Sequence, residues 1–178
     1  MNYLTRISNI TGDDYQVHQQ LKDIFDQDKI LFQRGKFETV VLSNKKPTVS
    51  QTPMVTKQIS DFIDSMNCGS EFLFTTRLNP VVTTKIDQKS KRIPIEQNKL
   101  RAWINDKLTN RGMSADFIYN TEGPRTCFKK SHKITLSSVF VTGMCQVEDR
   151  DLFKNALTKG IGHAKGLGFG MLNVFANL

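Results

Sequence analysis

The sequence predicts an α+β protein built from two tandem ferredoxin-like (βαββαβ) domains. Two observations lead to this fold class. Apolar patterns in the first eighty residues follow the order strand, helix, strand, strand, helix, strand, and the second half repeats most of that order. A chain of 178 residues has room for two small domains. We expect the N-terminal domain to span residues 1–70 and the C-terminal domain to span residues 71–178.

The first half begins with a short strand over residues 3–8, which an amphipathic helix follows. We expect Thr11 to cap this helix, with Asp14 as its capping-box partner, and the helix to end near Gln27. Apolar residues recur along it at i, i+4, i+7 and i+8, which predicts one buried face. Those residues are Val17, Leu21, Ile24 and Phe25.

Four further segments complete the first half. Residues 29–33 and 37–42 predict the strands of a hairpin, because a glycine lies in the turn between them. Thr52 and Pro53 predict the start of a second helix, with proline at the first helical position. Its expected buried face contains Val55, Ile59, Phe62, Ile63 and Met66. A strand over residues 71–78 follows.

The second half predicts a similar order of elements. Its expected elements are a helix over residues 96–111, strands over 115–120, 125–130 and 134–147, a helix over 149–158 and a last strand over 170–175. This order needs one more strand at its start. The sequence leaves open whether residues 71–78 or residues 81–86 supply that strand.

Charge is unevenly distributed between the two halves. The net charge is +8, but residues 1–74 hold 8 Lys and Arg against 9 Asp and Glu, whereas residues 75–178 hold 17 against 8. A basic surplus confined to one half indicates a polyanionic partner, RNA or DNA, bound mainly by that half. The alternatives are an anionic membrane surface and simple solubility. Membrane binding is the weaker of them, because no basic amphipathic helix stands out.

The cysteines and the N-terminus indicate an intracellular protein. Cys68, Cys127 and Cys145 are odd in number and far apart, so they form neither a disulfide framework nor a Cys-x-x-Cys pair. The first residues contain no long apolar run, which argues against a signal peptide or a membrane span. We therefore expect a reducing, cytoplasmic compartment.

Glycine is concentrated near the C-terminus. Five of the 11 glycines lie between Gly160 and Gly170, together with Lys159, His163 and Lys165. Backbone N–H groups and cations can surround a phosphate together, so this segment is a candidate phosphate site. Its place after a helix and before a strand, without Gly-Lys-Ser/Thr, argues against a nucleotide cofactor. The alternative is a helix C-cap at Gly160 and a tight connection into an edge strand.

The histidines do not indicate a metal site, because His18, His132 and His163 are scattered without a second ligand at the usual spacing. His18 is a candidate for other chemistry, since Tyr15, His18 and Lys22 form one stripe on the predicted helix. Such a set can cleave RNA without a metal: histidine exchanges protons near neutral pH, and the cation stabilises charge on the phosphate.

Each side chain of that stripe also has a structural explanation. Tyr15 would pack on Ile10 as a hydrophobic staple, His18 would border the core beside Phe25, and Lys22 would be a solvated surface charge. A second basic segment, predicted to be a hairpin, also has two explanations. It contacts the groove or backbone of a nucleic acid, or it is an ordinary solvated hairpin. Its basic residues are Arg125, Lys129, Lys130, His132 and Lys133.

Three segments carry a family resemblance. They are Tyr15-Gln-Val-His-Gln-Gln-Leu21 on the first helix, Phe72-Leu-Phe-Thr-Thr-Arg-Leu-Asn-Pro-Val-Val82 with the later Lys91-Arg-Ile-Pro94 and the helix carrying Trp103, and the glycine-rich Leu157-Thr-Lys-Gly-Ile-Gly-His-Ala-Lys-Gly-Leu-Gly-Phe-Gly-Met-Leu172. In this order they resemble the CasE-type CRISPR endoribonucleases, the crRNA-processing subunits of type I-E Cascade complexes. From the first to the last, these segments span most of the chain.

The resemblance implies a RAMP-type pair of ferredoxin-like domains and cleavage of the CRISPR repeat hairpin in a prokaryotic cytoplasm, without metal or cofactor. The 2′-OH attacks the adjacent phosphate and leaves a 2′,3′-cyclic phosphate and a 5′-OH. By motif, His18 is the acid or base and Tyr15 its partner, and other Cascade subunits are implied partners. The implied RNA-binding residues are Lys22, Arg125, Lys129, Lys130, Lys133, Lys159, Gly160, Gly162, His163 and Lys165.

The chain also departs from the family pattern. Gln19 stands where an arginine commonly follows the histidine, the chain is short between residues 40 and 70, and it ends in Phe175-Ala-Asn-Leu178. Gln19 motivates an alternative, a subunit that binds the repeat hairpin and anchors a Cascade-like complex without cutting. A third hypothesis is an unrelated ferredoxin-like enzyme for a small phosphate ligand. The basic surplus of the second half argues against it, because a small ligand needs only a few cations.

Overall fold

Two four-stranded sheets and one separate hairpin make up the protein in the computed structural model, which describes residues 1–27, 29–48, 52–86, 89–129 and 131–176. The first sheet has the order β2-β3-β1-β4 and the second has the order β10-β5-β9-β8. In each sheet the first strand lies between the third and the last, and every neighbouring pair is antiparallel. This is the ferredoxin-like strand order, so the predicted fold class is confirmed.

The first sheet uses only residues before 59. Its elements are β1 (Tyr3–Ser8), α1 (Asp14–Phe25), β2 (Leu31–Arg34), β3 (Glu38–Ser43) and β4 (Met54–Gln58). Helix α1 packs on one face of the sheet through Val17, Leu21 and Phe25, which meet Ile7 and Phe32 in a small core. The described residues between β3 and β4 form no helix, so this unit has one helix where a complete ferredoxin-like unit has two.

The helix predicted to start at Thr52 is wrong. Residues 54–58 form β4, which pairs with β1, and only a short helix, α2 (Ser60–Ser65), follows. Val55, expected in the buried face of that helix, is 73% exposed. The physical reason is that β4 satisfies the backbone groups of β1 along the edge that β3 leaves open, and a short apolar pattern does not distinguish this outcome from a helix.

The start of α1 also differs from the prediction. Asp13, not Thr11, caps the helix: its carboxylate accepts hydrogen bonds from the N–H groups of Tyr15 and Gln16, each at 2.9 Å, and the Gln16 side chain completes a capping box. Asp14 is instead buried in an ion cluster. The helix ends at Phe25, two residues earlier than expected.

The second sheet forms a complete ferredoxin-like unit. Its elements are β5 (Glu71–Leu78), β6 (Val81–Ile86), β7 (Lys89–Pro94), the short 3₁₀ segment η1 (Gln97–Lys99), α3 (Leu100–Thr109), β8 (Met113–Lys129), β9 (His132–Val147), α4 (Arg150–Lys159), a second 3₁₀ segment η2 (Lys165–Leu167) and β10 (Leu172–Ala176). Residues 71–78 thus supply the strand that the sequence left undecided, while β6 pairs with β7 in a separate two-stranded sheet. The boundary at residue 70 remains a prediction, although the first sheet draws its strands from residues 3–58 and the second from 71–176.

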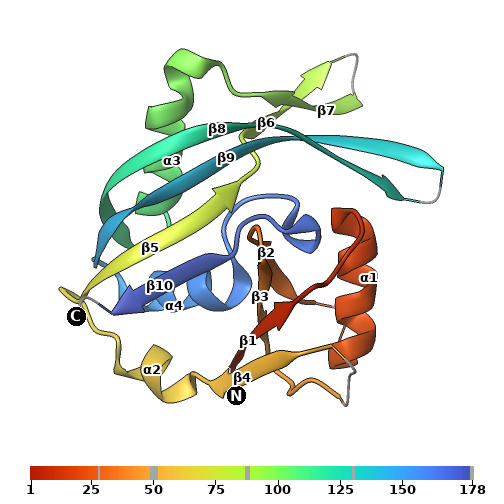
Figure 1. Ribbon diagram of the computed structural model, residues 1–178. Coiled ribbons are helices and arrows are strands. Elements are labelled where there is room, and N and C mark those ends of the chain that lie inside the picture. The colour runs from red at the N-terminus through yellow and green to blue at the C-terminus, as the bar shows by residue number, and fades with distance from the viewer. Residues whose placement is uncertain (28, 49–51, 87–88, 130, 177–178) are drawn as a thin grey trace.

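The strands predicted at 115–120 and 125–130 are one long strand, β8, with an irregularity between Glu122 and Arg125. Together β8 and β9 extend beyond the sheet, and their hairpin passes over the start of α1 (Figure 1). The segment between α4 and β10, which belongs to the second unit, also packs against the first unit: its η2 contacts both α1 and β2. The two units therefore meet at α1 on two sides. Within the described ranges, no helix is both long and apolar enough to cross a membrane.

Candidate functional site

His18 lies at the contact between α1 and the glycine-rich segment. Its ring stacks on the buried ring of Phe32, with centroids 6.2 Å apart and planes 13° apart. Gly166 lies against the same imidazole, since a Cβ on this glycine would be only 3.2 Å from His18 Cε1. The histidine therefore does border the core, as its structural explanation requires, and it also faces the segment that the sequence marked as a phosphate site.

A cavity of about 420 Å³ opens beside His18. Its lining residues are His18, Lys29, Ile30, Leu31, Thr158, Lys159, Lys165 and Gly166. Three lysines thus surround one histidine, and they come from the start of β2, the end of α4 and η2. At such a site a histidine can move a proton next to a phosphate, and the neighbouring cations can stabilise the charge on that phosphate.

Lys165 is held in place within this cavity. Its Nζ donates a hydrogen bond to the Lys159 carbonyl at 2.6 Å. Burial, and next the nearby charge of Arg111, lower the pKa of Lys165 from its ordinary value. An anion in the cavity would relieve both effects, because it would replace lost solvation and offset the neighbouring charge.

Lys29 was not anticipated from the sequence. It precedes the apolar strand β2 and looked like an ordinary strand start. Only the packing of β2 against the glycine-rich segment brings it to the cavity that His18 lines. No sequence signal could have identified it, because the other two cations of the cavity, Lys159 and Lys165, lie more than a hundred residues away.

The glycine-rich segment is also required by the fold. Gly160 ends α4, and the segment leads into β10 at the edge of the second sheet, so the structural explanation for these glycines is confirmed. At Gly170, φ is +74° and a Cβ would lie 2.1 Å from the Ile161 carbonyl oxygen. Gly162 differs, because its φ is +73° but a Cβ there would meet nothing within 4 Å. This open space leaves room for a ligand beside Gly162.

His163 is exposed on a basic side of the same segment. Partial burial, followed by the charges of Arg92, Lys107 and Lys165, lowers its pKa from the ordinary value. Strand β7 and helix α3 therefore bring cations close to the glycine-rich segment. This neighbourhood suits an extended anion that runs beyond the His18 cavity.

Tyr15, the predicted partner of His18, faces a separate hollow. That hollow is lined by Thr11, Gly12, Tyr15, Gln16, Gln19 and Gln20. The structure thus brings His18 together with Lys159 and Lys165 but places Tyr15 elsewhere along α1. Lys22 is half-buried in the last turn of the helix. The roles of both residues remain predictions.

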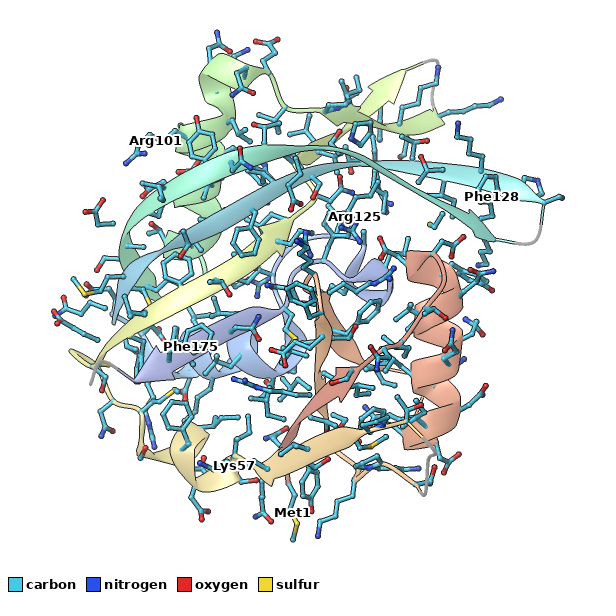
Figure 2. The ribbon with its side chains drawn as sticks, viewed as in Figure 1. Met1, Lys57, Arg101, Arg125, Phe128 and Phe175 are labelled. Carbon is cyan, nitrogen blue, oxygen red and sulfur yellow. The ribbon has the colours of Figure 1, made fainter. Side chains whose placement is uncertain are left out.

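The basic hairpin of β8 and β9 has two different parts. Lys129, His132 and Lys133 are exposed at its outer end, and Lys130 lies outside the described residues. Arg125 is instead bound to Asp14 of α1 through two hydrogen bonds of 2.8 and 2.7 Å. Figure 2 shows Arg125 and Phe128 along this hairpin, on the side of the molecule where α1 begins.

A second ion pair lies next to this contact. Arg77 of β5 binds both carboxylate oxygens of Glu122, at 2.7 and 3.0 Å, and donates to the Arg34 carbonyl at 3.0 Å. Burial raises the pKa of Glu122, but hydrogen bonds from Arg77 and Ser138 and the charges of Arg77 and Arg125 outweigh it and lower the pKa overall. These pairs join residues far apart in sequence, so residue spacing could not reveal them. Within the described ranges, no three His, Cys, Asp or Glu side chains are grouped to hold a metal ion.

Comparisons with known proteins agree with this architecture. The chain is 27% identical over 185 residues to the CRISPR system Cascade subunit CasE of Escherichia coli strain K12, covering 91% of this chain and 92% of that protein. The crystal structure of Cas6e from Escherichia coli K-12 covers 99% of this chain and 100% of its own, with 24% identity and a TM-score of 0.77. A structure of CRISPR endoribonuclease Cse3 bound to 19 nt RNA covers 98% and 100%, with 17% identity and a TM-score of 0.81.

These likenesses define a class of proteins with two tandem ferredoxin-like domains. The model of the family described as CRISPR associated protein matches residues 4–175, which is nearly the whole chain. The chain belongs to this family, as a divergent CasE-type member.

Proposed function

We propose that this protein is the endoribonuclease that processes CRISPR transcripts, and that it binds the repeat hairpin and cuts it without a metal ion. The observation that carries the proposal is the cavity in which His18 meets Lys29, Lys159 and Lys165. The names of its relatives support the proposal, since one is a Cascade subunit and another is an endoribonuclease bound to RNA. The substrate would be made in the prokaryotic cytoplasm, where we expect the protein to act beside other Cascade subunits.

In the proposed reaction, the ribose 2′-oxygen forms a bond to the adjacent phosphorus and the bond from phosphorus to the 5′-oxygen breaks. The 2′-OH loses its proton and the departing 5′-oxygen gains one, which leaves a 2′,3′-cyclic phosphate and a 5′-OH. His18 exchanges one of these protons, because an imidazole can act as a general acid or base and this one borders the cavity. The lysines stabilise the extra negative charge on the phosphate, and Tyr15 remains a candidate for the second proton transfer.

The charge distribution supports a proposal that the second half makes the remaining contacts to RNA. We propose that the exposed Lys129 and Lys133 grip the stem of the hairpin. The glycine-rich segment would hold the backbone near the cut, with His163 and the open space at Gly162 beside it. Both contacts are to phosphates, so binding should weaken steeply as salt is added.

The test is cleavage of a labelled repeat hairpin from the same genome in excess EDTA, comparing wild type with His18→Ala. We expect the variant to cut at least about 100-fold more slowly while binding the hairpin as before. Asp23→Ala is the matched control, since Asp23 is exposed on the same helix. A deoxyribose at the cut site should also block the reaction. His18→Ala cutting at the wild-type rate would refute the assignment.

A second candidate is a subunit that binds the hairpin without cutting it. Two observations favour it: Gln19 stands where the family commonly has arginine, and Tyr15 lines a different hollow from His18. It predicts salt-dependent binding with no products from the wild type. A slow cut that depends on His18 would exclude it.

A further inference from the structure

A cluster of one buried carboxylate and two half-buried arginine side chains lies where α1 begins. Asp14 is 4% exposed and accepts hydrogen bonds from Nε and Nη2 of Arg125, a residue of β8. Arg34 of β2 lies 3.3 Å from the same carboxylate and donates to the Gly12 carbonyl at 2.8 Å. The cluster thus joins α1 to both units of the protein.

One backbone contact reinforces this junction. The Phe128 N–H donates a hydrogen bond to the Asp13 carboxylate at 3.0 Å. Two positions of β8, Arg125 and Phe128, therefore contact the start of α1. Figure 1 shows the hairpin of β8 and β9 crossing this end of the helix.

The geometry of the cluster is more informative than its stability. A buried ion pair contributes little net stability, because the cost of desolvation offsets the attraction. A bidentate pair of arginine and carboxylate does, however, fix the relative orientation of the two groups. Asp14 and His18 are four residues apart, so they lie on the same side of α1 in successive turns. Because Asp14 and His18 belong to the same helix, fixing Asp14 relative to β8 also fixes the position of His18 relative to β8.

The hairpin continues from the cluster to an exposed basic end. Lys129, His132 and Lys133 lie there, within eight residues of Arg125 along the hairpin. One rigid connection thus runs from the exposed cations, through Arg125 and Asp14, to the histidine in the cavity.

We propose that Asp14 and Arg125, with Arg34, are positioning residues that lock the RNA-holding hairpin to the helix that carries His18. This inference rests on the proposed function. RNA held at the hairpin is then presented to His18 in one fixed geometry. Arg125 accordingly acts through Asp14 and not by contacting RNA.

The experiment compares Arg125→Lys with Arg150→Lys under single-turnover conditions with saturating hairpin RNA. Lysine keeps the charge but loses the bidentate pairing. We expect Arg125→Lys to cut about 10- to 100-fold more slowly, because small displacements of a catalytic group are costly, with a dissociation constant within about 3-fold of wild type. Arg150 is the matched control: it bridges α4 to the Asp64 and Met66 carbonyls and does not touch α1. Arg150→Lys should leave both quantities unchanged.

Two outcomes would overturn the inference. One is an Arg125→Lys protein that cuts at the wild-type rate. The other is one that binds much more weakly but cuts normally once saturated, which would make Arg125 an RNA contact. If Arg125→Lys does not fold, Asp14→Asn takes its place, because the amide keeps an acceptor oxygen and the size of the side chain.

A second measurement is independent of cleavage. Hydrogen exchange is followed with and without uncut RNA in a His18→Ala background. We expect bound RNA to slow exchange in both the hairpin and α1, and to slow it in the hairpin alone when Arg125 is also changed to Lys. Equal protection of α1 in both proteins would refute positioning. If the wild type never cuts the RNA, the proposed function is refuted, but the hydrogen-exchange comparison still tests whether Arg125 couples the hairpin to α1.

Discussion

The two ferredoxin-like units share a strand order but differ in how they are supported. The second unit has two helices, α3 and α4, over one face and a large core centred on Phe74, Ile104 and Phe153. Among its described residues the first has one helix on its sheet, α1, and its other face closes against the second unit through a small cluster that includes Leu42 and Met171. The smaller unit carries His18, while the larger carries most of the positive charge. The difference teaches that the candidate site belongs to the junction and to neither unit alone.

The largest expected effect on stability comes from removing a buried ring from the core of either unit. Phe153→Ala and Phe25→Ala should each lower the free energy of unfolding by about 3–5 kcal/mol, because each removes a fully buried ring. If the first unit depends on the second, Phe153→Ala will loosen both sheets, whereas Phe25→Ala will loosen β1 to β4 only. Thermal unfolding together with residue-resolved hydrogen exchange measures this.

The control for both cores is Ile118→Ala, a change at a side chain of β8 that is 73% exposed. It should alter the free energy of unfolding by no more than about 0.5 kcal/mol. Equal loosening of both sheets by Phe25→Ala would contradict the asymmetry between the units.

The glycine-rich segment between α4 and β10, which packs against the first unit, gives the next effect. Gly170→Ala should cost about 2–4 kcal/mol of unfolding free energy, because a Cβ would collide with the Ile161 carbonyl at a positive φ. Gly162→Ala has a similar φ without a collision and should cost only about 1 kcal/mol. Chemical denaturation of both variants measures the difference. Similar losses of stability in both variants would mean that backbone strain, and not close packing, explains why glycine is needed at these positions.

A third prediction concerns the cation that the smaller unit supplies. Lys29→Ala should slow cleavage at saturating RNA about 10-fold, because it removes a positive charge beside the phosphate in the His18 cavity. Lys36→Ala is the control, since Lys36 is exposed at the turn after β2 and lies over Phe37. A rate unchanged by Lys29→Ala would assign charge stabilisation entirely to the second unit.

The smallest effect is a pH dependence in the second unit. The pKa of His163 is lowered by burial and by Arg92, Lys107 and Lys165, so the imidazole is harder to protonate in the free protein than an ordinary histidine. A bound phosphate would raise that pKa and draw in a proton. Affinity for the hairpin should therefore rise as pH falls from 7.5 to 6, by about 2- to 5-fold. His163→Asn should abolish the rise, and dissociation constants at constant ionic strength measure it. A rise that survives in the variant would exclude His163 as its source.

Local sequence patterns determined much of this protein. The strand at residues 3–8, the hairpin around Gly35, the strand at 71–78 and the helix before Gly160 all follow from periodicity and turn chemistry, because those signals act between near neighbours. The motifs around His18 and Lys165 pointed to the family for the same reason: each is contiguous. The segment from residue 52 failed because its short apolar run suits a helix or a strand, and pairing with β1 decided between them.

Only the tertiary structure decided how these pieces combine. It placed Lys29 beside His18, turned Tyr15 toward a different hollow and bound Asp14 to Arg125 across 111 residues of sequence. Such contacts depend on how the two sheets pack, and no residue spacing encodes that packing. The sequence by itself therefore determined most of the elements, the family and the candidate histidine. The folded chain determined which cations surround that histidine and what holds its helix in place, because both depend on contacts between distant segments.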